Sequence, residues 1–271
     1  MLTESFQSIA SATRQLLRNW RLMIVLAGLY ASLIAALYLF VTIREASAGQ
    51  VVLSLVLGII APFLFFILQT AGASQKRSLG ARQLLREALK NSGKVIAVGL
   101  PLITLAVLLT YLSGKALLYM GTDGRELSDV AALDQVGASN EGRPALRWSQ
   151  VILNCIRYLF LGLVIPLVAI HLWIASVESD LLTTVRATKE LIPGAFAPPS
   201  VLIYTVGFGV FGVIPYLLLF KPTPARSAWM EIAFFVARLM LVFVLTLFGW
   251  LVTMNALAIS TSKRSCQNGE R

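Results

Sequence analysis

Three ionisable side chains lie within long apolar stretches, where such a group is a candidate for function. They are Arg157, His171 and Arg238, and His171 is the only histidine. A histidine can ligate the iron of a haem or the magnesium of a chlorin, but one histidine in a helix bundle is more often hydrogen-bonded to a neighbour. Both arginines lie close enough to the end of an apolar stretch to extend to the membrane surface, and the alternative is a substrate or lipid-headgroup site. We therefore predict no cofactor.

Patterns typical of catalytic and metal sites are not met elsewhere. One histidine cannot form a histidine cluster for a metal, and no neighbouring stretch supplies an acid for a Ser-His-Asp arrangement. Residues 207–212 match the G-x-G-x-x-G of nucleotide-binding turns, but they lie in an apolar stretch without a preceding strand. We interpret them as a small-residue face where another helix packs closely. The chain is predicted to be no enzyme and to hold no metal.

The composition indicates a membrane protein. Of the 271 residues, 57% are hydrophobic and 13% charged, which is more apolar surface than a soluble domain of this size can bury. A helix needs about 20 apolar residues to cross the hydrocarbon core, and lipid offers its backbone groups no other partner. We predict an all-α bundle of six transmembrane helices that forms a single integral membrane domain over residues 1–271. The spans are expected at 22–43, 51–72, 95–114, 151–177, 200–220 and 234–260.

Basic residues predict the orientation. With the N-terminus in the cytoplasm, fourteen Lys and Arg residues fall inside and seven outside, so both termini are expected in the cytoplasm. The basic residues that give the net charge of +10 lie in short loops beside the spans, where they can contact anionic lipid headgroups. No nucleic-acid partner is therefore predicted. The outer loop 115–150 carries five acids and four bases without the spacing of a calcium loop. This loop is either a docking surface for another protein or a partly disordered connection.

Amphipathic segments precede the odd-numbered spans, at residues 3–20, 76–94 and 180–192, and are expected to lie on the cytoplasmic surface. The pentapeptide Arg-Gln-Leu-Leu-Arg occurs at both 14–18 and 82–86. We interpret the chain as three units of a surface helix and a helical hairpin, although any inner membrane surface also collects arginine and leucine. The residues predicted to bind lipid headgroups are Arg14, Arg18, Lys76, Arg77, Arg82, Arg86, Lys90 and Lys94.

Proline inside the spans predicts kinks, because its ring clashes with the carbonyl four residues earlier. Residues 57–62 and 161–166 share the pattern L-G-x-x-x-P, in which glycine at that carbonyl lowers the cost of bending. Kinks are expected at Gly58, Pro62, Pro101, Gly162, Pro166 and Pro215. Transporters use kinked helices for gating, but inert bundles contain them too, and we favour the inert interpretation.

Three motifs carry a resemblance to a known group. They are S-F-x-x-I-x-x-x-x-R-x-L-L-R-N before the first span, A-R-Q-L-L-R-E-A-L-K-N before the third, and D-L-L-T-T-V-R-A-T-K-E-L-I-P-G-A-F before the fifth. The chain, apart from loop 115–150, resembles a broad bacterial family of uncharacterised six-span membrane proteins that includes the membrane domain of some glycerophosphodiester phosphodiesterases. The resemblance implies the bacterial inner membrane and three surface helices, and no catalytic residue.

The function expected from these features is that of a structural or accessory subunit, which packs against a larger membrane assembly or organises lipid. The alternative is a small-molecule or lipid transporter that uses its proline-kinked helices. A transporter should contain a polar cavity at mid-membrane, whereas an accessory subunit should have a closed apolar core. The expected partners are membrane lipids, including anionic lipids at the cytoplasmic face, and other membrane protein subunits.

Overall fold

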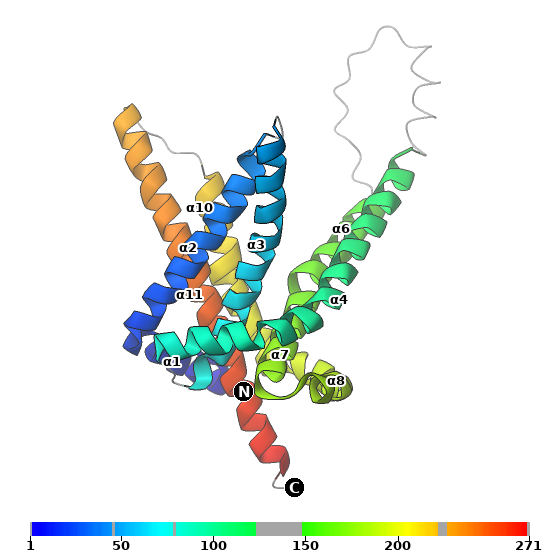
Figure 1. Cartoon of the computed structure of the whole chain (residues 1–271). Helices are drawn as coiled ribbons and strands as arrows, with labels where there is room; N and C mark the ends of the chain where they lie inside the picture. The colour runs from blue at the N-terminus through cyan, green and yellow to red at the C-terminus, as the bar shows by residue number, and fades with distance from the viewer. Residues whose placement is uncertain (1, 45–46, 78–79, 123–147, 222–226, 270–271) are drawn as a thin grey trace. The chain divides into compact units, whose positions relative to one another are not determined.

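The structure, a computed structural model, describes residues 2–44, 47–77, 80–122, 148–221 and 227–269 (Figure 1). These residues are about 95% helical and contain no strand. Among these described residues, six helices are long and apolar enough to cross a membrane, which confirms the predicted all-α class with six candidate spans. They are Trp20–Thr42, Ala48–Ala73, Arg82–Tyr119, Trp148–Glu178, Pro198–Phe220 and Ala228–Ser262. Residues 123–147 of the predicted outer loop lie outside the described residues.

Residues 123–147 separate the helices of the third and fourth spans, and the other described helices are separated by few residues. In chain order they are α1 (Leu2–Arg18), α2 (Trp20–Thr42), α3 (Ala48–Ala73), the 3-10 turn η1 (Ser74–Arg77), α4 (Ala81–Thr122), α6 (Trp148–Leu159), the π-helical turn η2 (Phe160–Val164), α7 (Ile165–Glu178), α8 (Leu181–Ala195), α9 (Pro198–Phe208), the π-helical turn η3 (Gly209–Val213), α10 (Ile214–Phe220) and α11 (Ala228–Gly269). The basic segment before the third span continues into that span as the single helix α4. Its Ala, Arg, Gln, Leu, Glu and Lys residues are strong helix formers, and the weaker helix formers Asn91, Ser92 and Gly93 at the junction do not interrupt the helix.

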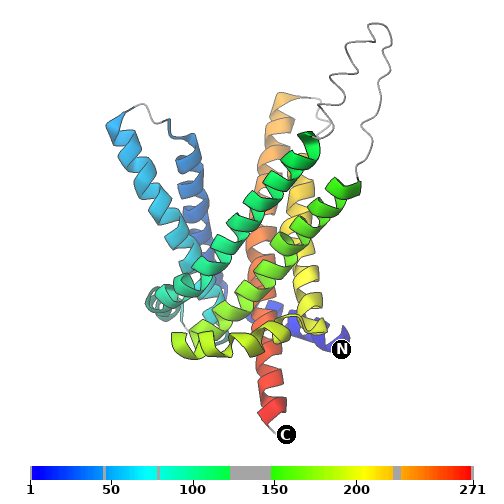
Figure 2. The ribbon, with the colours of Figure 1, turned by 90° about the vertical axis from the view of Figure 1, so that its right-hand side faces the viewer.

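The chain forms two compact units. The larger unit comprises Met1–Val98 and Leu167–Arg271, and the smaller comprises Gly99–Pro166. In the larger unit α2 and α3 pair as a hairpin, and α11 packs against α1, α3, α9 and α10 (Figure 2). The first and last helices are joined by a hydrogen bond, in which Asn255 Nδ2 donates to Gln15 Oε1 at 3.3 Å. The larger unit is therefore closed by contacts between the two ends of the sequence.

Burial in the larger unit is concentrated at one end of its spans. All residues from 66 to 73 in α3 and from 251 to 258 in α11 are buried. The opposite ends of the same helices, at 51–60 and 228–241, expose most of their large apolar side chains. In a membrane, such exposed apolar surface faces acyl chains or a partner's helix. The protein core of this unit thus lies at the end where α1 crosses α9 and α11.

Small residues let α9 and α11 touch. A Cβ built on Gly207 would overlap Thr253 Oγ1 and lie 2.8 Å from its Cγ2. A Cβ built on Gly249 of α11 would lie 3.0 Å from Phe211 Cβ. The prediction that the G-x-G-x-x-G segment is a face for close helix packing is confirmed at Gly207, whereas a Cβ on Gly209 would meet nothing within 4 Å.

Of the four prolines at which kinks are predicted, two follow π-helical turns. The residue before each of these prolines donates its N–H to the carbonyl five residues earlier, from Ile165 to Phe160 and from Ile214 to Gly209. A π-helical turn accommodates one extra residue and changes the hydrogen-bond register ahead of the missing proline N–H. The turns η2 and η3 thus end two residues before Pro166 and Pro215.

The other two prolines lie inside continuous α-helix, Pro62 in α3 and Pro101 in α4. The shared L-G-x-x-x-P pattern therefore has two local structures, α-helical at 57–62 and π-helical at 161–164. The kinks at Gly58, Pro62, Pro101, Gly162, Pro166 and Pro215 remain predictions.

Candidate functional site

The two copies of Arg-Gln-Leu-Leu-Arg have matching environments in α1 and α4. The first leucine of each copy is buried, with Leu16 2% and Leu84 1% exposed. Each buried leucine belongs to a stripe at three- and four-residue spacing, which is Ser5, Ser8, Ala12 and Leu16 in α1 and Leu84, Ala88, Ser92 and Val95 in α4. The arginines of both copies, Arg14, Arg18, Arg82 and Arg86, are exposed.

Each of these helices has an exposed apolar face between its buried stripe and its basic face. Successive residues are rotated by about 100°, so Leu17, which is 65% exposed, lies beside the stripe that contains Leu16. Phe6 shares the exposed face of α1. On α4 the residue that matches Leu17 is Leu85, which is half-buried, and Leu89 one turn later is the exposed apolar residue. A helix with this order of faces can lie at a membrane surface with its apolar face toward acyl chains and its arginines toward headgroups.

The third amphipathic segment, predicted at 180–192, is α8. Its Thr184 and Ala195 are buried, while Leu182 and Val185 are exposed apolar residues. Arg186 and Lys189 are exposed as well. The helix α8 therefore also combines a buried face with exposed apolar and basic residues.

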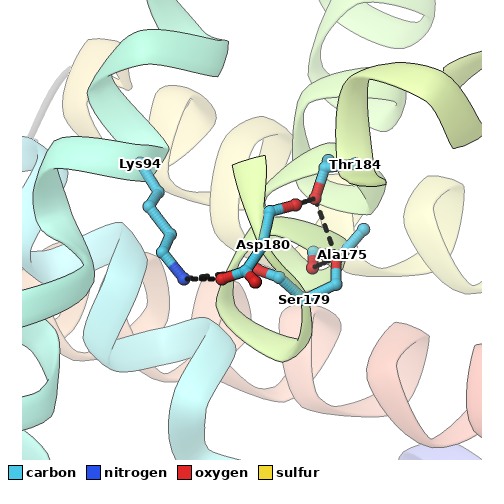
Figure 3. Close-up of polar contacts among 5 residues, drawn as sticks. All are labelled: Lys94, Ala175, Ser179, Asp180 and Thr184. Atoms are coloured by element: carbon cyan, nitrogen blue, oxygen red, sulfur yellow. Dashed lines mark hydrogen bonds and ion pairs between the residues drawn. The ribbon is translucent and has the colours of Figure 1, made fainter. Parts of the chain in front are cut away.

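A polar cavity of about 430 Å³ lies between α4 and the turn from α7 to α8. It is lined by Glu87, Lys90, Asn91, Lys94, Val177, Glu178, Ser179 and Asp180. Lys94 Nζ donates to Ser179 O at 3.3 Å and lies 3.5 Å from Asp180 Oδ1 (Figure 3). Asp180 occupies the N-cap of α8, but its side chain makes no capping hydrogen bond. Its carboxylate faces Lys94 instead.

Hydroxyl groups fix the backbone of this turn. Ser179 Oγ donates to Ala175 O at 2.8 Å, and it also lies 2.8 Å from Thr184 Oγ1. Thr184 Oγ1 donates to Asp180 O at 3.1 Å, and Figure 3 shows these bonds closing the turn around Asp180. Thr184 is buried, so these hydrogen bonds lie on the side of the turn that faces the protein interior. The Asp180 carboxylate lines the cavity.

The predicted lipid-binding residues do not form one group. Arg82, Arg86 and Lys90 are exposed on α4, but Lys94 is partly buried and paired with Asp180. Lys76 and Arg77 belong to η1, and their side chains lie outside the described residues. Sequence reasoning missed the pairing of Lys94 with Asp180, because it placed the two residues in separate amphipathic segments, 76–94 and 180–192.

The three ionisable residues predicted within spans lie in different helices. Arg157 is in α6 of the smaller unit, and its buried Nε has no hydrogen-bond partner among the described residues. Arg238 of α11 donates to Lys221 O, at the end of the fifth span. His171 is buried in α7, where Nδ1 lies 2.9 Å from Leu167 O. This hydrogen bond within its own helix is the kind of contact expected for a lone histidine.

Two further cavities lie among the spans of the larger unit, and their linings are mainly apolar. One of about 170 Å³ is formed by α1, α9, η3 and α11 around Gly207, with Ile, Val and Phe side chains. The other, of about 210 Å³, is bounded by α2, α3, η3 and α11. Within the second lining, Trp250 Nε1 donates to Gln69 Oε1 at 2.9 Å.

Within the described ranges, no group of three or more His, Cys, Asp or Glu residues could hold a metal ion. The chain matches no protein-family model, no curated protein and no solved structure at a significant level.

Proposed function

We propose that this protein is a non-enzymatic structural protein of the bacterial inner membrane that organises anionic lipid at the cytoplasmic leaflet. In this proposal α1, the beginning of α4 and α8 lie at the membrane surface, and both termini are cytoplasmic. The observation that carries it is the matching pair of pentapeptide environments, in which a buried leucine anchors each helix while its arginines stay exposed.

The charges are sufficient for a strong lipid preference. Each basic residue near an anionic membrane surface contributes about 1 kcal/mol. The four exposed arginines of the two copies would together contribute about 4 kcal/mol, or roughly a thousandfold preference for anionic over neutral lipid. The exposed apolar residues of the same helices set the depth at which these charges meet headgroups.

The span-level cavities support a structural role over transport. A passage for a polar solute needs polar groups from several spans facing one cavity. Two cavities among the described spans are lined mainly by apolar side chains, and α9 meets α11 closely at Gly207. The exposed apolar ends of α3 and α11 also suit contact with a larger membrane protein, so the proposed role includes that of an accessory subunit.

Lipid binding by matched double variants tests the proposal. Arg14→Gln with Arg82→Gln removes one arginine from each pentapeptide, and Arg44→Gln with Lys221→Gln removes two exposed bases elsewhere. Native mass spectrometry of the protein with phosphatidylglycerol and phosphatidylcholine would measure both affinities. The first variant should lose phosphatidylglycerol preference by roughly 30-fold, from about 2 kcal/mol, and the control should change little. Equal losses in the two variants, or none in the first, would refute the proposal.

A further inference from the structure

We propose that the polar cavity between α4 and the α7–α8 turn binds a phosphoethanolamine group, with its ammonium on the carboxylates and its phosphate on the lysines. The site differs from the exposed arginine faces in both residues and ligand, since phosphoethanolamine is zwitterionic. It shares with the proposed function only the placement of α4 and α8 at the membrane surface.

The charges around the cavity favour a ligand that carries both signs. Three carboxylates, Glu87, Glu178 and Asp180, and two ammonium groups, Lys90 and Lys94, line it. A simple anion would be repelled by the carboxylates, and a simple cation by the lysines. A phosphate joined to an ammonium by two carbons can pair with both sets at once.

Lys94 and Asp180 have hydrogen-bonding capacity left for such a ligand. A lysine ammonium has three donors, and the two contacts of Lys94, at 3.3 and 3.5 Å, are long. The side chain of Asp180 is 90% exposed and spends no oxygen on capping α8. A pair this exposed adds little stability, so a ligand can exchange it for its own contacts at small cost.

The cavity has the size and the position of a headgroup site. Its volume of about 430 Å³ lies within the range of about 300–1,000 Å³ typical of small-ligand pockets. Glu178 is the last residue of the fourth span, so the lining stands where the apolar helix ends. The hydroxyl bonds of Ser179 and Thr184 hold this turn in place before any ligand arrives, which reduces the entropy lost on binding.

Lipids that differ only in headgroup test the inference. The full-length protein in detergent micelles would be titrated with phosphatidylethanolamine and phosphatidylcholine of identical chains, read by native mass spectrometry. A primary ammonium donates three hydrogen bonds to carboxylates and a trimethylammonium donates none, so phosphatidylethanolamine should bind at least tenfold more tightly. The variant Asp180→Asn should lose this preference, and Lys94→Gln, which removes a partner of the phosphate that both lipids share, should bind both lipids more weakly. The matched controls Glu231→Gln and Lys189→Gln, exposed residues outside the cavity, should retain both the preference and the affinities.

The outcomes separate this inference from the proposed function. Equal binding of the two lipids by the wild type, an unchanged preference in Asp180→Asn, or unchanged affinities in Lys94→Gln would each overturn the inference. Phosphatidylglycerol binding in the same preparations reports on the arginine faces. If Asp180→Asn and Lys94→Gln lost phosphatidylglycerol binding while the control variants kept it, that result would also count against a separate site. Tighter binding of free phosphoethanolamine than of the lipid would identify a soluble ligand, and the reverse order a phospholipid; either supports the cavity as the site.

Discussion

Replacing Gly207 with alanine should weaken the contact between α9 and α11. The added Cβ would overlap Thr253 Oγ1 and lie 2.8 Å from Cγ2 and 2.9 Å from Cβ of the same residue. Thr253 is only 2% exposed, and its Oγ1 donates to Gly249 O at 2.7 Å, so the side chain cannot turn away without losing that bond. The helices must separate instead. Forcing an extra carbon into a close-packed interior costs about 1–3 kcal/mol.

Reversible unfolding of the purified protein in mixed micelles, followed by tryptophan fluorescence, would measure the loss. Gly28→Ala is the matched control, because a Cβ there meets nothing within 4 Å and alanine is a better helix former by about 1 kcal/mol. Thr253→Ala removes two of the three clashing atoms. The loss in unfolding free energy of the double variant Gly207→Ala with Thr253→Ala should therefore be smaller than the sum of the two single losses, by about 0.5–3 kcal/mol. Strict additivity, or a Gly207→Ala protein as stable as Gly28→Ala, would refute the close contact.

Three more results are expected. Leu16→Ala and Leu84→Ala should each lower the free energy of unfolding by about 2–5 kcal/mol, whereas Leu17→Ala should change it by about 0.5 kcal/mol or less; similar losses at all three would contradict the burial pattern. Trp250→Phe removes an indole N–H that bonds across helices and should cost about 1 kcal/mol in the same assay, with no loss arguing against that bond. A topology reporter fused after Arg271 should signal from the cytoplasm, and a signal from the outside would reverse the proposed orientation.

The spans could be predicted because membrane insertion depends on local composition. A stretch of about 20 uncharged residues is visible in the sequence whatever it later packs against. The contact at Gly207 was predictable for a similar reason, since clustered glycines allow close helix approach. Composition did not predict that α4 is one continuous helix from Ala81 to Thr122. The change from basic to apolar residues marks where the surroundings of the helix change, but the backbone stays helical across that point.

The cavity could not be predicted because it depends on rotation around a helix and on a distant turn. Arg82, Arg86, Lys90 and Lys94 follow one another at four-residue spacing, which suggests a single basic face. Each four-residue step, however, turns about 40° further around the helix, and three steps turn about 120°. This drift carries Lys94 from the exposed face of Arg82 to the side that meets Asp180, which is 86 residues away in the chain.

The bond between Gln15 and Asn255 also sets a time scale for assembly. The two residues are 240 positions apart in the chain. At synthesis rates of about 5–20 residues per second, roughly 10–50 s pass between the synthesis of Gln15 and that of Asn255. During that interval α1 has no α11 to pack against. The buried stripe that must wait consists of Ser5, Ser8, Ala12 and Leu16, of which only Leu16 is large and apolar. With one large apolar side chain among four, this stripe offers little surface to a wrong partner before α11 is made.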